Sequence, residues 1–213
     1  MNKTEQIYKV LLADIIKGEL YQGQRLIEKE LINEYKISKT PLREALRKLE
    51  KIGIVKYNVN CGYLIRRVLR KDAEEIYDLR EIIDCLSVRK IIENITEGKI
   101  KKIKNINNDM EACIKNNEKE KYIELDKKMH KLLTKLSDNE RLMEIGENLN
   151  YQISMLLKTS INLPGRGMKQ SFEEHVNIFN AILNKDSKKA EELAKKHIRN
   201  TKIAVLKYFD EMH

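Results

Sequence analysis

Along most of this chain apolar residues recur three or four positions apart, and in one short region they alternate with polar residues. The first spacing is typical of helices and the second of strands. The helical spacing predicts helices over residues 7–15, 27–35 and 38–52, and a tight turn joins the last two as in a helix-turn-helix. Beyond Gly53, the alternation over residues 54–68 predicts a two-stranded hairpin around a turn-rich centre. The first third of the chain therefore predicts a winged helix-turn-helix.

The helix predicted over residues 38–52 has two chemically different sides. One side is apolar and must be buried, because it carries Leu42, Leu46, Leu49 and Ile52. The other side carries basic residues at four-residue intervals, namely Lys39, Arg43, Arg47 and Lys51. Ser38 can cap the helix with its side-chain oxygen, and Pro41 falls in the first turn, where its missing N–H costs nothing. A row of cations along one side of a helix suits DNA, and a solvated basic face is the alternative.

The rest of the chain has the pattern of an all-α domain. A charged junction at residues 70–72 leads into six helical segments, with Asp72 placed to cap the first of them. The segments cover about residues 73–94, 99–116, 119–136, 140–160, 168–183 and 187–209. The predicted fold is therefore mainly α. It consists of a winged helix-turn-helix domain over residues 1–69, a short linker over 70–72 and a six-helix bundle over 73–213.

Charge is divided unevenly between these two parts. Residues 1–71 hold 16 Lys and Arg against 8 Asp and Glu, whereas residues 72–213 hold 26 against 25. A basic module joined to an electrically balanced one indicates a nucleic-acid partner. No apolar run approaches the ~20 residues of a membrane span, and the first residues lack the apolar core of a signal peptide. We therefore expect a soluble cytoplasmic protein that does not bind a membrane.

Three histidines lie inside the predicted bundle helices, and one of them is spaced to act together with an acid. Asp126 and His130 are four residues apart, so they share one face of a helix and form a two-ligand half-site. His175 and His197 lie on semi-apolar faces that a bundle turns inward. A single inward histidine is more often a hydrogen-bonded core residue than a metal ligand. Three imidazoles with one carboxylate, however, suit zinc, nickel, manganese or iron.

Two other interpretations of these four residues stay open. They can hold a catalytic ion in a metalloenzyme, although no general base or nucleophile stands out apart from the neighbouring Glu173 and Glu174. Alternatively, the histidines are structural and the bundle binds a metal-free organic ligand. The basic helix-turn-helix favours regulation over catalysis, so we expect that the chain is not an enzyme.

The first third of the chain also resembles a known family at many fixed offsets. Turns at Gly18 and Gly23, the segment SKTPLREAL over residues 38–46, and Gly53 resemble the winged-helix domain of GntR-type bacterial transcription regulators. This resemblance covers residues 5–68. By position, the DNA contacts of that family fall on Lys29, Ser38, Lys39, Thr40, Arg43 and Gly62. Because many relatives carry arginine where this chain has its two lysines, we expect Arg43 to make the bidentate base contact and the lysines to bind phosphate.

The second part is similar to the FCD effector-binding domain of the FadR-type branch of that family, and six helices fit its shorter VanR-like variant. The similarity rests on the motifs D-x-x-x-H from Asp126, E-H-x-x-I from Glu174 and A-x-x-H-I from Ala194. It spans most of residues 73–209. It implies a divalent metal ion, with zinc placed first, held by Asp126, His130, His175 and His197.

The same resemblance implies the partners of the protein. A small carboxylate effector is expected over the metal, and Arg80 matches an arginine that the family commonly turns toward the ligand cavity. An ion pair with Asp84, four residues along, is the alternative for that arginine. We expect a homodimer on a palindromic DNA operator, in which the effector reorients the winged helices through the short junction. Repression and activation both stay open at this point.

Overall fold

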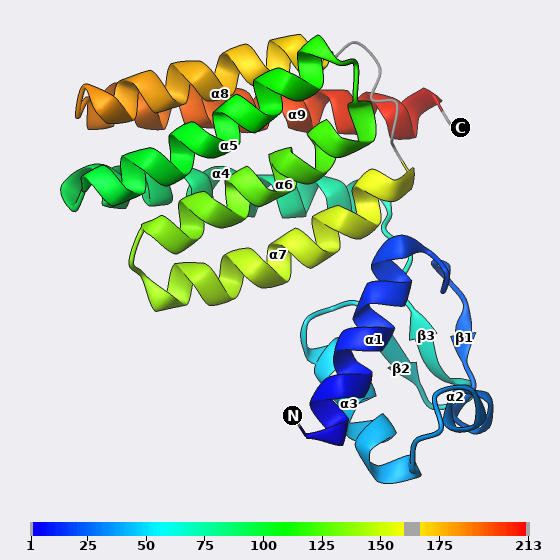
Figure 1. Cartoon of the computed structure of the whole chain (residues 1–213). Coiled ribbons are helices and arrows are strands. Elements are labelled where there is room, and N and C mark those ends of the chain that lie inside the picture. Colours follow the sequence, from blue (N-terminus) through cyan, green and yellow to red (C-terminus); the bar gives the residue numbers. More distant parts are fainter. Residues whose placement is uncertain (1, 160–166, 212–213) are drawn as a thin grey trace. The chain divides into compact units, whose positions relative to one another are not determined.

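The computed structural model of the chain describes residues 2–159 and 167–211 (Figure 1). The described part divides into two compact units. The first contains the chain up to Leu69 together with the end of helix α7 from Tyr151, and the second contains the other described residues from Arg70 onward. A winged helix-turn-helix followed by a helical bundle confirms the predicted fold class. Among the described residues, no helix is both long and apolar enough to cross a membrane.

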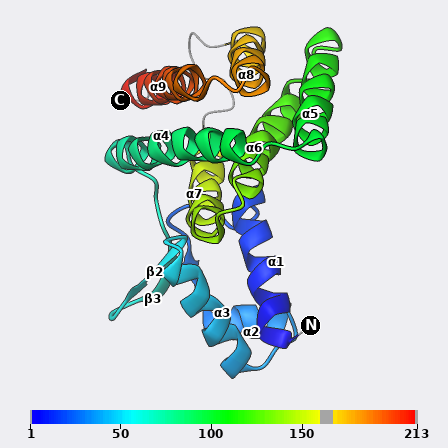
Figure 2. The same cartoon turned by 90° about the vertical axis from the view of Figure 1, so that its left-hand side faces the viewer.

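Helices α1, α2 and α3 and a three-stranded sheet form the first unit (Figure 2). Their bounds are α1 (Lys3–Lys17), β1 (Arg25–Leu26), α2 (Glu28–Glu34), α3 (Lys39–Lys51), β2 (Val55–Asn58) and β3 (Gly62–Ile65). The strands are antiparallel in the order β1-β3-β2. Tyr57 lies opposite Tyr63 in the predicted hairpin. The sequence pattern did not predict the short strand β1. It lies on the side of β3 opposite β2, where Leu26 pairs with Tyr63.

Individual residues explain where these helices begin and end. Asn2 caps α1 by accepting a hydrogen bond from the N–H of Thr4, and Gly18 ends it in the left-handed conformation with a φ of 72°. Ser38 occupies the N-cap position of α3, but its side chain makes no capping hydrogen bond, so that prediction is wrong. Pro41 lies in the first turn of α3, as the sequence predicts.

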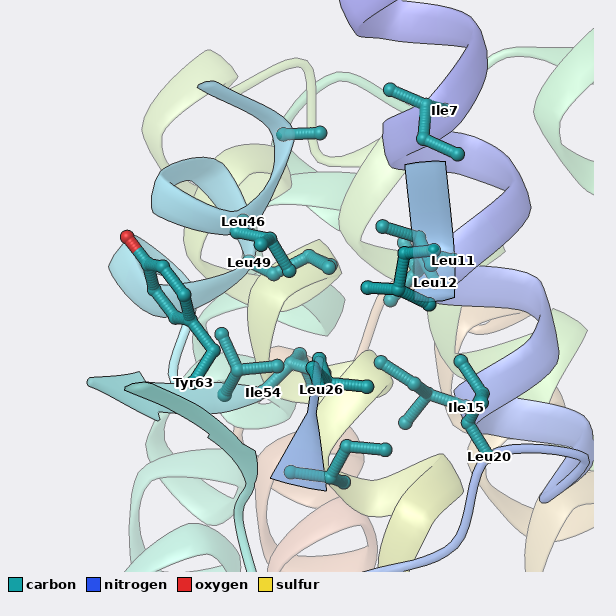
Figure 3. Close-up of a cluster of buried hydrophobic side chains, with 14 of the residues drawn as sticks. Ile7, Leu11, Leu12, Ile15, Leu20, Leu26, Leu46, Leu49, Ile54 and Tyr63 are labelled. Carbon is teal, nitrogen blue, oxygen red and sulfur yellow. The ribbon is translucent and has the colours of Figure 1, made fainter. Parts of the chain in front are cut away.

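Apolar side chains of α1, α3 and the sheet meet in one core (Figure 3). In this core Leu11 of α1 lies near Leu46 and Leu49 of α3, and Leu26 and Ile54 close the side next to the strands. The predicted apolar side of α3 is therefore buried, apart from its last member, which is partly buried. Its opposite side faces solvent and exposes Lys39, Arg43, Arg47 and Lys51.

Helices α4 to α9, apart from the end of α7 from Tyr151, form the second unit. Their bounds are α4 (Arg70–Glu93), α5 (Glu97–Lys115), α6 (Lys119–Leu136), α7 (Glu140–Thr159), α8 (Met168–Leu183) and α9 (Ser187–Glu211). These bounds agree with the six predicted segments to within a few residues, and the break predicted at Pro164 and Gly165 lies outside the described residues. Residues 70–72 form the first turn of α4. The prediction that Asp72 caps this helix is therefore wrong.

The bundle helices enclose polar groups as well as apolar ones. Helix α4 packs along α9 and against α6, while α8 contacts both α5 and α9 (Figures 1 and 2). Their facing sides share an apolar core built largely from Leu, Ile, Met and Ala. Several ionisable residues are nevertheless buried here, namely Arg80, Asp84, His130, His175 and His197. Buried charges need partners, so these side chains define the candidate site.

Candidate metal centre and nucleic-acid interface

Three helices bring the predicted metal ligands together. Asp126 and His130 lie one turn apart on α6, His175 comes from α8, and His197 comes from α9. One donor atom from each residue lies within 4.8 Å of the others. The three imidazoles are buried and the carboxylate is partly buried. Helical spacing placed the first two on one face, and the packing of α8 and α9 supplies the other two.

The four side chains contact one another directly. Nε2 of His175 lies 2.8 Å from Oδ1 of Asp126, and Nε2 of His130 lies 3.3 Å from Nε2 of His197. Nε2 of His130 is also 3.8 Å from Oδ2 of Asp126. Ser171 of α8 donates its hydroxyl to Oδ1 of the same carboxylate at 3.4 Å. Donors this close converge on one small volume, as the ligands of a single metal ion do.

Burial and neighbouring side chains shift the pKa values of three of these groups. It lowers the pKa of His197 to about 3, an effect to which the neighbouring His175 adds. Burial is also the main reason that the pKa of His130 lies below its ordinary value, and the charge of Arg80 contributes. For Asp126, burial alone would raise the pKa, but the hydrogen bond with His175 and the nearby imidazoles hold it well below its ordinary value. Neutral imidazoles and an ionised carboxylate are the forms that bind metal ions.

The donor set itself fits the metal that the resemblance implies. Three imidazole nitrogens and one carboxylate oxygen suit zinc, and nickel, manganese and iron accept the same ligands. Calcium and magnesium prefer sites built from oxygen, and the cluster offers only one carboxylate. The residues of this chain can therefore hold a divalent transition metal ion.

Two of the histidines have a carboxylate on their far side. Oδ2 of Asp84, on α4, lies 2.6 Å from Nδ1 of His130. Oε2 of Glu174, on α8, lies 2.8 Å from Nδ1 of His197. Sequence reasoning missed both contacts, because it considered the first acid only as a partner of Arg80, and the second only as part of a motif and as a general base. The available signal was an acidic residue on a buried helix face, where an unpaired charge is costly.

Arg80 lies on α4, one turn before Asp84, and its side chain is only 6% exposed. Its Nε is 3.7 Å from Oδ2 of Asp84, so the ion pair that the sequence offered as the alternative is present. Burial alone would raise the pKa of Asp84, but His130 and Arg80 hold it below its ordinary value. A distance of 3.7 Å is too long for a hydrogen bond, so this ion pair does not use the five N–H donors of the guanidinium.

The helix-turn-helix exposes the residues that match DNA contacts. The exposed set consists of Lys29 on α2 with Ser38, Lys39, Thr40 and Arg43 around the start of α3. At the wing, Gly62 has a φ of 78°, and a Cβ there would meet no described atom within 4 Å. Glycine adopts this conformation freely and leaves the backbone open to close approach.

Arg43 is held by an acid that sequence reasoning did not include. Its Nε donates to both carboxylate oxygens of Glu28, the first residue of α2, at 2.8 and 3.0 Å. The Arg43 side chain remains 51% exposed. Since the contact uses Nε, the two terminal nitrogens stay available for the edge of a base. The structure thus links α2 to the candidate base-reading residue of α3.

Known proteins match the chain in both units. Residues 3–65 match the family described as bacterial regulatory proteins, gntR family, and residues 75–200 match the FCD domain. The HTH-type transcriptional regulator YdhC of Bacillus subtilis strain 168 is 31% identical over 195 residues, which covers 91% of this chain and 84% of that protein. The HTH-type transcriptional repressor RspR of Escherichia coli K12 is 25% identical over 198 residues, which covers 92% and 85%.

Solved structures share the whole architecture. E. coli McbR/YncC superposes with a TM-score of 0.80 at 20% identity, covering 98% of both chains. A putative GntR transcriptional regulator from Rhodococcus sp. RHA1 superposes with a TM-score of 0.79 at 18% identity, covering 97% of this chain and 98% of that one. At such low identity these structures support the fold alone.

Proposed function

The chain belongs to the GntR family of DNA-binding transcription regulators and carries an FCD domain, and on this premise we propose that it responds to a small carboxylate bound at a divalent metal. The observation that carries the proposal is the cluster of Asp126, His130, His175 and His197 with donors within 4.8 Å. Zinc is the ion that we propose, and nickel, manganese and iron suit the same donors. The relatives are transcription regulators, which bears out the expectation that the chain is not an enzyme.

Residues of the bundle support a carboxylate as the effector. A bound metal ion supplies a Lewis acid to which a carboxylate oxygen can coordinate. The ion pair of Arg80 with Asp84 uses no hydrogen bond, and a guanidinium can hold a carboxylate through two parallel hydrogen bonds. Arg80 contacts Asp84, which in turn contacts the proposed ligand His130, so an anion held by this guanidinium would lie beside the metal centre.

On the DNA side, we propose that α3 lies in the major groove and that Arg43 reads a base there. Lys29 and Lys39 would bind phosphates, and Ser38, Thr40 and the wing at Gly62 would complete the contacts. A homodimer would place one such helix on each half of a palindromic operator. The name of the relative RspR is that of a repressor, and we propose repression for this chain also.

The proposed domains are residues 1–69 for DNA binding and residues 73–213 for effector and metal binding, joined at residues 70–72. The joining residues are helical and begin α4, the helix that also carries Arg80 and Asp84. An effector that binds the two states of the dimer with different affinity would shift the population between them. Only residues 66–69, which belong to no helix or strand, connect β3 to α4.

The effector proposal is tested by measuring DNA affinity in the presence of small carboxylates. Metal-loaded protein is titrated onto the promoter of its own gene, with a panel of these acids added in turn. We expect one of them to change the affinity about 5- to 150-fold. Arg80→Met is saturated with metal before the measurement, because Arg80 also contacts Asp84. It is expected to lose the response to the acid while keeping the DNA affinity measured without effector.

Arg89→Met, on the same helix but exposed, is the matched control and should respond as the wild type does. A response that persists in Arg80→Met would remove Arg80 from the effector site. No response to any acid in the panel would contradict a carboxylate effector.

A second prediction concerns Glu28, whose carboxylate orients Arg43. We expect Glu28→Gln to raise affinity for nonspecific DNA, since a negative charge near the phosphates is removed. The ratio of operator to nonspecific affinity should fall by up to about fivefold, the scale of an exposed ion pair. Glu30→Gln makes the same charge change on α2 and should leave that ratio unchanged. Equal ratios in both variants would show that Glu28 does not orient the base-reading residue.

A further inference from the structure

We propose that Asp84 and Glu174 are positioning residues of the metal centre, which hold His130 and His197 with their Nε2 atoms toward the ion. Neither acid is among the four ligands of the proposed site, and each contacts a histidine at Nδ1, at 2.6 and 2.8 Å. The inference rests on the proposed metal site and adds the groups that orient two of its ligands.

The two hydrogen bonds determine which ring nitrogen carries the proton. An ionised carboxylate can only accept, so each Nδ1 must donate to it. A neutral imidazole has a single N–H, and its Nε2 is then left as an acceptor. Nε2 of His130 and Nε2 of His197 lie 3.3 Å apart. Two acceptors at that distance repel each other unless a proton or a metal ion lies between them, so the outer carboxylates favour a cation at this point.

Each carboxylate is held in turn by a second partner. The other oxygen of Glu174 accepts a hydrogen bond from Nδ2 of Asn200 on α9 at 2.7 Å. Asp84 is buried and has Arg80 at 3.7 Å. These contacts restrict the orientation of the acids and hence of the imidazoles that they bind. Outer partners of this kind fix the ring and raise the basicity of the ligating nitrogen.

Asp84 also has a role that Glu174 does not share. Glu174 lies on α8 next to His175, so its bond to His197 joins two helices that already supply ligands. Helix α4 supplies none of the four ligands, and Asp84 connects it to His130 on α6. Metal binding would therefore strengthen the contact between α4 and α6 through this single carboxylate.

The first test measures zinc affinity by competition with a chromophoric chelator. We expect Asp84→Asn and Glu174→Gln each to weaken binding about 10- to 100-fold, as the loss of outer partners commonly does. Glu81→Gln is the control, because Glu81 lies on α4 and pairs with Lys195 and Arg199 rather than with a histidine. The control should bind zinc as the wild type does. Wild-type zinc affinity in both Asp84→Asn and Glu174→Gln would overturn the inference.

The second test reads the histidine protons in metal-free protein by nitrogen NMR with isotope-labelled histidine. We expect the Nδ1–H form at His130 and His197 in the wild type, and loss of that preference at His130 in Asp84→Asn. An Nε2–H form at both histidines of the wild type would overturn the inference. Wild type that takes up no zinc would instead contradict the proposed metal site, while the proton positions would still test the two acids. If one variant does not fold, the other still tests the proposal at its own histidine.

Discussion

Replacing His130 by alanine is expected to abolish stoichiometric metal binding. The variant removes one of four donors and takes away the imidazole that Asp84 orients. The measurement is metal analysis of protein purified without a nickel column. Wild-type protein should carry about one ion per chain, as expected of a single four-donor site, and the variant far less.

Thermal unfolding with and without zinc distinguishes a loss of metal binding from a loss of packing in the bundle. At zinc about 100-fold above its Kd, the wild type should gain about 2.7 kcal/mol of stability, because the ion binds only the folded state. His130→Ala should gain almost nothing, whatever its stability without metal. Lys128→Ala, at an exposed position on the same helix, should gain as the wild type does. Sub-stoichiometric wild-type metal that His130→Ala leaves unchanged would remove the ion from the proposal.

Replacing Arg43 by alanine is expected to cause the largest loss of operator recognition. Arg43 is exposed on α3, and its terminal nitrogens are available for a base edge. A bidentate base contact of this kind is worth about 5- to 150-fold in discrimination at each half-site. The measurement is affinity for the promoter and for unrelated DNA over a range of salt concentrations.

Two further variants identify the reason for this loss. Arg43→Lys keeps the charge but loses the planar fork, so it should keep the salt dependence and lose discrimination. Lys51→Ala removes a charge at the far end of the same basic row and should leave the ratio of operator to unrelated DNA unchanged. An Arg43→Ala protein that protects the same operator bases as the wild type would contradict the assignment of α3 to the groove.

The sequence predicted most of the fold because its information is local. Apolar spacing along α3 identifies the buried stripe at Leu42, Leu46 and Leu49, and the alternation after Gly53 identifies the hairpin. Strand β1 was not predicted, because its two residues are too few to show a periodic pattern. They form a strand only because they pair with β3. The start of α4 was placed late because the charged residues 70–72 looked like a junction, whereas they continue the helix.

Packing at the end of α7 was also invisible in the sequence pattern. From Tyr151 onward this helix belongs to the first compact unit, and Met155 lies in the core formed by α1, α3 and the sheet. Helical periodicity shows that one side of α7 is apolar but does not show which apolar surface it covers. A division of the chain into two continuous segments therefore misses this part of the first core.

The sequence by itself determined which residues share a helix face, because the helical period is a property of neighbouring positions. In this way it singled out the pair Asp126 and His130 and the basic row of α3. Only the tertiary structure decided that Asp84 contacts His130, that Glu174 contacts His197, and that Glu28 holds Arg43. Those contacts join different helices, and their geometry depends on how the helices pack.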